Sequence, residues 1–345
     1  MPGQDHIGII RLSALGDVAM TVPVIRVLRA TYPNLEITII SRSFFKPFFQ
    51  ELDGVHFIEA DVKGEHKGIP GLLKLAGLIR QSGVTAVADL HDVIRSKILV
   101  TSLRSRGLRC AVIDKGRKEK RQLIRNKGAK LANLKSTHQR YADVLAGLGY
   151  PIDLDKHQYP QRPSLTPRLS NWINADGNKL IGIAPFAAYR SKTYPLDLMH
   201  EVLSGLDQKG KYQILLFGGG KQEVEQLDAL ANGLDSVVSV AGRMTLAEEL
   251  ILIANLDLMV AMDSGNGHLA AMFDLPVITL WGVTHPAAGF TPFGQSADNQ
   301  LLSDREQFPL IPTSVYGNKY PESYMEVMRT ISPEQIATLI SKRLS

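Results

Sequence analysis

The chain contains 345 residues, of which 44% are hydrophobic and 21% are charged, and its formal net charge is +5. This composition is typical of a soluble globular protein, and the length exceeds the usual size of one hydrophobic core, so we expect two domains. The single cysteine, Cys110, excludes an intramolecular disulfide and a multi-cysteine metal site. No apolar run approaches the roughly 20 residues of a transmembrane helix, and the N-terminus lacks the pattern of a secretory signal. We therefore expect a cytoplasmic protein, and no histidine spacing such as HExxH predicts a metal site.

The positive charge is concentrated in one segment, residues 104–135. This basic segment holds twelve Lys and Arg residues against two acidic ones, Asp114 and Glu119, so the rest of the chain has a negative balance. Such a segment could bind nucleic acid, an anionic membrane surface or an anionic substrate, or it could be a solvated surface. No aromatic residues are interleaved with the charges, which argues against single-stranded nucleic acid. We expect no nucleic-acid partner.

The chain opens with a pattern that is typical of a parallel sheet. Residues 7–12 predict a strand, 18–28 a helix and 37–41 a second strand. Ligands of open parallel sheets bind at the carboxyl ends of the strands, and Asp17 follows the first strand. Its carboxylate is therefore predicted either to face a ligand or to cap the helix. The absence of a GxGxxG motif argues against a nicotinamide or flavin site in this half.

The rest of the first half continues this alternation. Further strands are predicted at 84–90 and 109–113, and helices at 69–82 and 137–148. The region after residue 163 is richer in Pro, Ser, Asn and Gly, which indicates a linker between domains, and we place that linker at 166–179.

The second half repeats the same pattern. Strands are predicted at 180–185, 212–217, 236–240, 256–262 and 277–281, and helices at 196–205, 222–231, 245–254 and 268–273. Three loops that follow strands, at Lys192, Gly218–Gly220 and Asp263–Gly267, are expected at one edge of the sheet. The second half is therefore predicted to be another α/β domain, followed by loops and a final helix from Pro333 to Leu344.

The loop Asp263–Gly267 lies between a predicted strand and a predicted helix. Its two glycines and its serine allow a ligand to approach the backbone, and the first N–H groups of the helix have no intrahelical acceptor. These features suit a phosphate or a diphosphate. The alternative interpretation is a tight turn in which Asp263 or Ser264 caps the helix.

Several motifs resemble those of one enzyme family. They are IGIIRLSALGDVAMTVPVIRVLR near the start, DLHDVIRS at 89–96, KTYP at 192–195, GRMTLAEE at 242–249, MDSGNGHLAA at 262–271 and TLWGVTHP at 279–286. Their order, and the paired motifs around Asp17 and Asp263, resemble glycosyltransferase family 9, the family of ADP-heptose:lipopolysaccharide heptosyltransferases.

The resemblance implies the GT-B fold class: α/β, with two Rossmann-like domains whose parallel sheets face each other across a cleft. The N-terminal domain, 1–165, would bind the acceptor, and 180–330 would bind the nucleotide sugar, with 331–345 forming a C-terminal helix that could pack back on the N-terminal domain. The implied reaction is an inverting, metal-independent transfer of a heptosyl unit from ADP-heptose to the lipopolysaccharide inner core, with no cofactor.

The resemblance also implies roles for residues at matching positions. Asp17 would take the proton from the acceptor hydroxyl, and Lys192 would neutralise the charge on the departing diphosphate. Donor binding is expected from Asp263, Ser264, Gly265, Asn266, His268, Met244, Gly219 and Glu223. Acceptor binding is expected from Ser13, Gly16, Asp89, His91, Arg95, Arg117 and Lys120.

Some positions depart from the family pattern. Tyr194 stands where the family often has Trp. Lys221-Gln222-Glu223 stands where relatives carry a glutamate after the glycine loop, so the contact of this stretch with the ribose or the donor sugar is left open. Residues 312–325 lack the cysteines that relatives have there.

Two other functions are compatible with these motifs. One is a GT-B transferase that uses another nucleotide sugar or another acceptor, and the other is a non-catalytic binder of nucleotide sugars. The presence of Asp17, Lys192 and Asp263 argues against a mere binder. The basic segment suits an anionic lipid-linked acceptor and a peripheral position at the inner face of the membrane. The sequence leaves open which heptose is transferred, to which core position, and in which oligomeric state.

Overall fold

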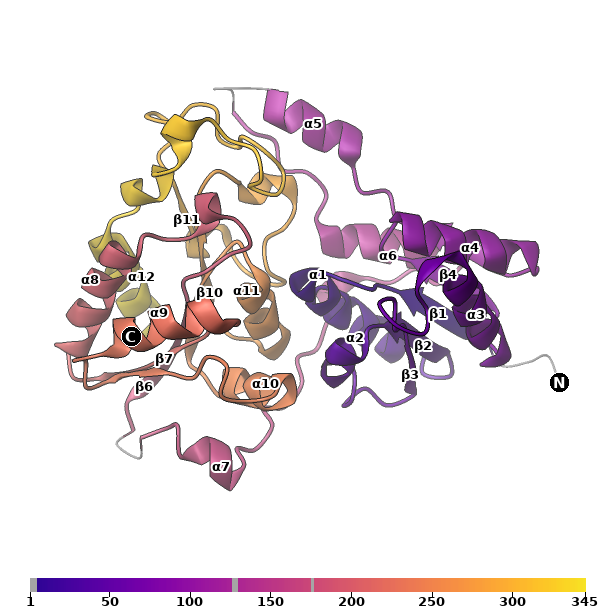
Figure 1. Ribbon diagram of the computed structural model, residues 1–345, viewed down its shortest axis with the longest axis horizontal. Coiled ribbons are helices and arrows are strands. Elements are labelled where there is room, and N and C mark those ends of the chain that lie inside the picture. The colour runs from indigo at the N-terminus through magenta and orange to yellow at the C-terminus, as the bar shows by residue number, and fades with distance from the viewer. Residues whose placement is uncertain (1–4, 126–129, 175–176) are drawn as a thin grey trace. The chain divides into compact units, whose positions relative to one another are not determined.

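The computed structural model describes residues 5–125, 130–174 and 177–345, which form two compact units. The first unit comprises Met1–Gly116 and Lys135–Gln158, and the second comprises Arg117–Leu134 and Tyr159–Ser345. Both units alternate strands with helices around a parallel sheet, which confirms the predicted α/β class (Figure 1). Residues 126–129 of the basic segment, with Lys127, and residues 175–176 of the predicted linker lie outside the described residues.

The first unit is built on a parallel sheet in the order β3-β2-β1-β4-β5. Its strands are β1 (His6–Ile10), β2 (Glu36–Ser41), β3 (Val55–Glu59), β4 (Ala86–Asp89) and β5 (Arg109–Val112). Its helices are α1 (Leu15–Ala19), α2 (Thr21–Thr31), α3 (Gly68–Gln81), α4 (Ile94–Ser105) and α6 (Thr137–Gly147). α2 packs against α6, and α3 packs against α4. Because helices cover both faces, β1 and β2 are almost wholly apolar and buried.

Two features of the first unit differ from the sequence prediction. The single helix expected at 18–28 is interrupted at Met20, so that α1 and α2 are separate helices. β3 was not predicted, because this edge strand lacks a fully buried apolar run: His56 and Glu59 are exposed and the other three residues are only half-buried.

The second unit has a parallel sheet in the order β11-β10-β9-β6-β7-β8. Its strands are β6 (Lys179–Ala184), β7 (Tyr212–Leu216), β8 (Val237–Ser239), β9 (Leu258–Met262), β10 (Val277–Trp281) and β11 (Gln300–Leu302). Its helices are α5 (Arg117–Arg125), α7 (Pro167–Ser170), α8 (Leu196–Asp207), α9 (Lys221–Ala231), α10 (Leu246–Ala254), α11 (Gly265–Ala270) and α12 (Pro333–Leu344). The adjacent strands β9 and β6 bring the loops after residues 262 and 184 to the same edge of the sheet.

The C-terminal helix α12 belongs to the second unit. Ile336 and Ile340 are fully buried in the core of that unit, and α12 packs against α8. The structure therefore corrects the expectation that residues 331–345 pack on the N-terminal domain. Ser332 caps the helix by accepting the N–H of Gln335, and Pro333 occupies the first turn as expected.

The middle of the basic segment also belongs to the second unit. Leu123 of α5 is buried against Ala287 and Ala288, and the Leu134 N–H donates to the Ala287 carbonyl over 2.9 Å. Residues 117–134 lie in chain order between predicted elements of the N-terminal domain, 1–165, yet they join the other unit. Long-range contacts, with Leu123 buried against Ala287 and Ala288 and Leu134 bonded to Ala287, show that this part of the chain joins the other unit.

Membrane-spanning helices are not found in the described parts of the chain, since none of the helices there combines sufficient length with sufficient apolar character.

Candidate functional site

In the first unit, Asp17 lies in α1, directly beyond the carboxyl end of β1. Its carboxylate accepts the Ala14 N–H over 3.3 Å and forms an ion pair with Arg11. The side chain of Asp17 is nevertheless 30% exposed. The prediction of Asp17 as the helix N-cap is wrong, because Ala14 is the N-cap of α1 and Asp17 is the third residue of that helix. From this position its carboxylate closes the first turn by accepting the N-cap N–H, and it is also accessible to a ligand.

Arg11 is a site residue that sequence reasoning missed. Its guanidinium is buried, donates to the Leu90 carbonyl over 2.6 Å and pairs with Asp17. The Tyr141 hydroxyl donates to the backbone carbonyl of Asp17 over 3.2 Å and fixes the same turn. The signal in the sequence is a lone charged residue within the apolar run IGIIRL. Burying a guanidinium costs free energy unless it is paired and hydrogen-bonded, so such a residue indicates a nearby carboxylate.

Asp89 and His91 lie at the carboxyl end of β4, which neighbours β1. The buried Asp89 carboxylate accepts the N–H groups of His91, over 2.9 Å, and of Asp92, over 3.1 Å, and burial raises the pKa of Asp89. His91 Nδ1 accepts the Leu12 N–H over 3.4 Å. Burial, with the nearby Arg11 charge, lowers the pKa of His91 to about 3, so its imidazole is neutral at neutral pH.

The structure therefore brings six of the predicted acceptor-side and catalytic residues to one edge of the first sheet. Ser13 and Gly16 are half-buried in the loop after β1, and Arg95 is exposed in the first turn of α4. Arg117 and Lys120 are not part of this group, because α5 belongs to the second unit. Lys120 is buried there, with its ammonium 4.0 Å from the centroid of the Phe290 ring.

In the second unit, Lys192 and Asp263 form a buried ion pair. Lys192 Nζ donates to the Asp263 carbonyl over 2.7 Å and lies 3.2 Å from its Oδ2, and both side chains are 11% exposed. The Thr284 hydroxyl donates to the same Oδ2 over 2.8 Å. Three motifs that are far apart in the sequence thus meet at the carboxyl edge of this sheet.

The backbone around Lys192 is fixed by contacts with a distant loop. The Ser191 hydroxyl donates to the Gly317 carbonyl over 2.6 Å, and the Val283 N–H donates to the Ser191 carbonyl over 3.3 Å. At Gly317, whose φ is +82°, a Cβ atom would lie 2.7 Å from Cγ of Lys192. Gly317 is therefore needed both for its backbone conformation and for the close approach of the lysine stem.

The segment after Asp263 is helical earlier than predicted. α11 starts at Gly265, so Gly265, Asn266 and Gly267 form its first turn instead of a loop. Ser264 occupies the N-cap position without a side-chain capping hydrogen bond, and the Asp263 carboxylate is directed to Lys192. Ser264 is thus the N-cap residue, as the alternative interpretation allowed, but its side chain does not cap the helix. His268 is buried within the same helix.

The remaining predicted donor residues lie in two loops of the same unit. Glu223 Oε2 accepts the Gly219 N–H over 2.8 Å, so this pair shapes the glycine loop itself. Met244 is half-buried and directly precedes Thr245, which caps α10 together with Glu248. The predicted cap at Thr245 is confirmed.

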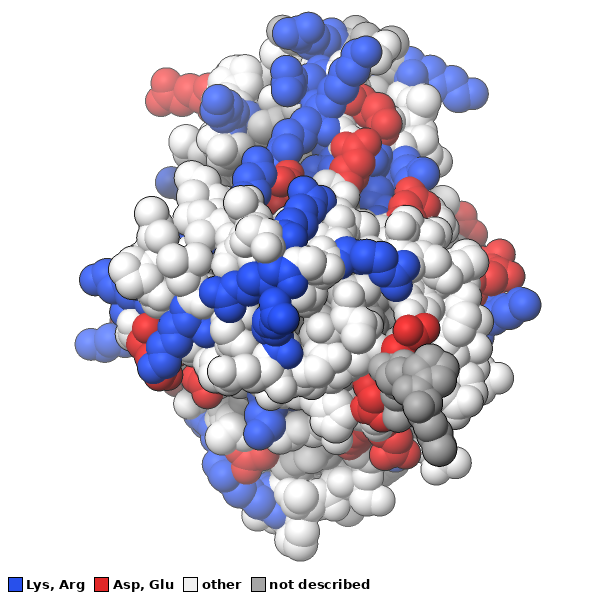
Figure 2. Space-filling view, turned by 90° about the vertical axis from the view of Figure 1, so that its right-hand side faces the viewer, with Lys and Arg blue, Asp and Glu red and all other residues white. Residues whose placement is uncertain are grey.

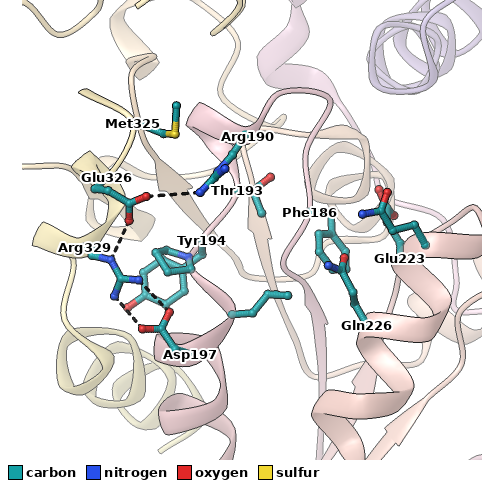
Figure 3. Close-up of a pocket in the computed structure, with 13 residues that line it drawn as sticks. Phe186, Arg190, Thr193, Tyr194, Asp197, Glu223, Gln226, Met325, Glu326 and Arg329 are labelled. Atoms are coloured by element: carbon teal, nitrogen blue, oxygen red, sulfur yellow. Dashed lines mark hydrogen bonds and ion pairs between the residues drawn. The ribbon is translucent and has the colours of Figure 1, made fainter. Parts of the chain in front are cut away.

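A polar cavity of about 620 Å³ lies beside the Lys192 loop (Figure 3). Phe186, Glu223 and Gln226 line one side of it, and Asp197, Glu326 and Arg329 line the other. Arg329 donates to Asp197 over 2.8 and 3.1 Å and to Glu326 over 2.7 Å. Since Arg329 is neutralised by two carboxylates, the cavity offers no strong attraction for an anion.

Glu249 in α10 provides a test of stability against pH. Burial raises the pKa of its carboxyl from 4.5 to about 7. Between these values the unfolded chain has lost the proton that the folded chain keeps, so the free energy of unfolding should fall as the pH rises through this range. Glu249→Gln should remove this slope and raise stability at pH 8 by about 3 kcal/mol. Denaturant titrations from pH 4 to 8 measure the free energy of unfolding, and Glu225→Gln, at an exposed position, is the control. If the free energies of the parent and of Glu249→Gln ran parallel over this pH range, the expectation would be contradicted.

Among the described residues, no group of three or more His, Cys, Asp or Glu side chains is arranged to hold a metal ion.

Comparisons with known proteins agree with one another. The family model described as glycosyltransferase family 9 (heptosyltransferase) matches residues 72–317. Lipopolysaccharide heptosyltransferase 3 of Escherichia coli K12 is 25% identical over 278 residues, which cover 78% of this chain and 80% of that protein. The lipopolysaccharide core heptosyltransferase OpsX of Haemophilus influenzae is 24% identical over 292 residues, 81% of this chain and 79% of that protein.

Solved structures share the fold. The family 9 glycosyl transferase of Veillonella parvula aligns with 100% of this chain and 98% of its own, with a TM-score of 0.75 and 20% identity. The E. coli heptosyltransferase WaaC, solved with ADP-2-deoxy-2-fluoro heptose, aligns with 98% of this chain and 99% of its own, with a TM-score of 0.65 and 19% identity. At these identities the likeness concerns the fold alone.

Proposed function

Because the chain belongs to glycosyltransferase family 9, we propose that it transfers a heptosyl unit from ADP-heptose to the inner core of lipopolysaccharide. Membership confirms the family that the motifs indicate, and the two parallel-sheet α/β domains agree with the predicted GT-B class. The choice of donor and acceptor is supported by the names of the relatives, which are lipopolysaccharide heptosyltransferases, and by the ADP-sugar bound to WaaC.

The observation that carries this proposal is the arrangement of Lys192, Asp263 and Thr284. An ammonium group has three N–H donors, and Asp263 accepts from Lys192 with its carbonyl and with Oδ2. The third donor can therefore serve the diphosphate of the donor sugar. The backbone N–H groups at the start of α11, at Ser264 to Asn266, would add further donors to the same phosphates. Asp263 Oδ1 would remain for a sugar hydroxyl.

The proposed reaction is a single displacement. The Asp17 carboxylate removes the proton from the acceptor hydroxyl, whose oxygen attacks the anomeric carbon as the bond from that carbon to the β-phosphate oxygen breaks. ADP leaves with the electron pair, and Lys192 and the α11 amides stabilise its charge. Attack opposite to the leaving group inverts the anomeric configuration. The proposal requires no metal ion and no cofactor.

We place this reaction in the cytoplasm, with peripheral attachment at the inner face of the inner membrane. The support is the basic segment, residues 104–135, because Lys and Arg residues near an anionic surface contribute about 1 kcal/mol each. In the structure this segment is divided, since residues 117–134 belong to the second unit and its remainder to the first.

The test is transfer from ADP-heptose to a deep-rough lipid A–Kdo acceptor, followed by ADP release and by the mass of the product. We expect turnover by the parent protein, and thermal stabilisation by ADP-heptose but not by UDP- or GDP-sugars. Stabilisation by a UDP- or GDP-sugar alone would overturn the donor assignment. Stabilisation by ADP-heptose without turnover on this acceptor would overturn the acceptor assignment.

A further inference from the structure

The first unit exposes large apolar side chains on two neighbouring helices. Nine large hydrophobic side chains are exposed within residues 5–125, 130–174 and 177–345, and four of these lie on α3 or at the start of α4. Ile94 is 79% exposed, Ile69 60% and Leu73 43%. Ile69 and Leu73 are one helical turn apart and therefore lie on the same face of α3. Clustered apolar groups of this kind are unusual on a monomer that contacts only water.

These three side chains lie at the same edge of the first unit. α3 precedes β4 and α4 follows it, and each helix runs back along a parallel sheet, so both begin at the carboxyl ends of the strands. α3 packs against α4, and at their far ends Arg80 donates to the Arg106 carbonyl over 2.9 Å. The first turns of the two helices therefore both lie at this edge of the sheet. We call Ile69, Leu73 and Ile94 the apolar surface; it lies beside Arg95, a predicted acceptor residue.

Positive charges lie close to the apolar surface along the chain. Exposed cations nearby are Lys63, Lys67, Lys74, Arg95 and Lys97. Of the acidic residues in the adjoining loops, Asp89 is buried, Asp92 is buried and paired with Lys97, and Glu65 is paired with Lys74. The half-buried Asp61 accepts the N–H groups of Gly64 and Glu65, so the five cations outnumber these four carboxyl groups. Figure 2 shows the side of the molecule that lies at the right of Figure 1, and there Lys and Arg side chains, with several Asp and Glu side chains, are spread among uncharged areas. Apolar groups bordered by cations match the interface of an anionic bilayer.

We propose that the apolar surface of Ile69, Leu73 and Ile94 inserts into the interface of an anionic bilayer and docks the first unit on the membrane. This inference rests on the proposed function, because an enzyme that acts on a lipid-anchored acceptor has to bind that acceptor at the membrane. It deepens that function by assigning the membrane contact to α3 and α4, with the cations around them, instead of to the basic segment alone. The acceptor residues at the same sheet edge would then lie next to the lipid headgroups.

The test compares three variants of the full chain in flotation with vesicles of phosphatidylethanolamine and phosphatidylglycerol. The first carries Ile69→Ser, Leu73→Ser and Ile94→Ser. A matched control carries Tyr189→Ser, Leu302→Ser and Tyr316→Ser, which remove three exposed apolar side chains from the second unit. The third carries Lys118→Gln, Arg121→Gln and Arg125→Gln, which remove exposed charges from α5.

We expect the first variant to lose vesicle affinity by about 100-fold or more, because each inserted aliphatic side chain accounts for roughly a tenfold effect. The matched control should bind as the parent does, and the α5 variant should lose a smaller factor. Thermal unfolding checks that all variants are folded. Undiminished binding of the first variant, absence of binding by the parent, or loss of all binding in the α5 variant would overturn the proposal.

A second measurement separates this inference from the proposed function. The first variant should transfer sugar to a deacylated, water-soluble core acceptor at the parent rate, yet lose activity on the same acceptor embedded in vesicles. An equal loss on both acceptors would place these residues in substrate binding and overturn membrane docking. If the parent uses neither acceptor but binds vesicles through the apolar surface, the proposed function fails while the docking surface stands.

Discussion

Replacing Asp17 by asparagine should lower the rate of transfer by about 100-fold or more, with the affinity for ADP-heptose unchanged. Asparagine keeps a side-chain oxygen that can accept the Ala14 N–H, so the first turn of α1 should persist. It lacks the carboxylate that would accept the acceptor proton. The measurement is kcat in the transfer assay, together with calorimetric binding of ADP-heptose.

Two further variants separate base catalysis from helix capping. Asp17→Ala removes both the carboxylate and the acceptor for Ala14, so it should lose as much activity as Asp17→Asn and also some stability. Asp143→Asn, which removes a surface carboxylate paired with Lys135 in the same unit, should leave activity unchanged. Full activity of Asp17→Asn, with a loss only in Asp17→Ala, would reduce Asp17 to a capping residue.

Replacing Lys192 by methionine should lower kcat by about 100- to 1,000-fold, because the charge on the departing diphosphate would lose its positive partner. The same change should destabilise the protein by about 3 kcal/mol, because Asp263 would stay buried without its ion pair. Lys179→Met, which removes an exposed lysine paired with Asp257 at the start of β6, is the control and should change neither quantity appreciably. Steady-state kinetics and denaturant unfolding measure the two effects.

A double variant shows whether Lys192 acts on the substrate or only on Asp263. Combining Lys192→Met with Asp263→Asn removes both members of the pair, so part of the lost stability should return. Activity should not return with it. Recovery of activity along with stability in the double variant would mean that Lys192 has a purely structural role.

The sequence determined the local elements and the family. Apolar periodicity predicted nearly every buried strand, since strands covered on both faces must be apolar throughout. The capping signals at Thr245 and Pro333 marked helix starts because they satisfy backbone groups within a few residues. The edge strand β3 was not predicted, because the exposed His56 and Glu59 interrupt its apolar run. The short motifs around Asp17 and Asp263 were sufficient to indicate glycosyltransferase family 9.

Only the tertiary structure decided which distant residues meet. Lys192 and Asp263 are brought together because β6 and β9 are neighbours in the sheet, an order that periodicity does not encode. The pairing of Arg11 with Asp17 depends on the turn after β1, although both residues were visible in the motif. The packing of α5 in the second unit depends on burial of Leu123 against a loop more than a hundred residues away. Local patterns fix elements because their physics acts over a few residues, whereas sheet order and side-chain pairing come from burial across the whole unit.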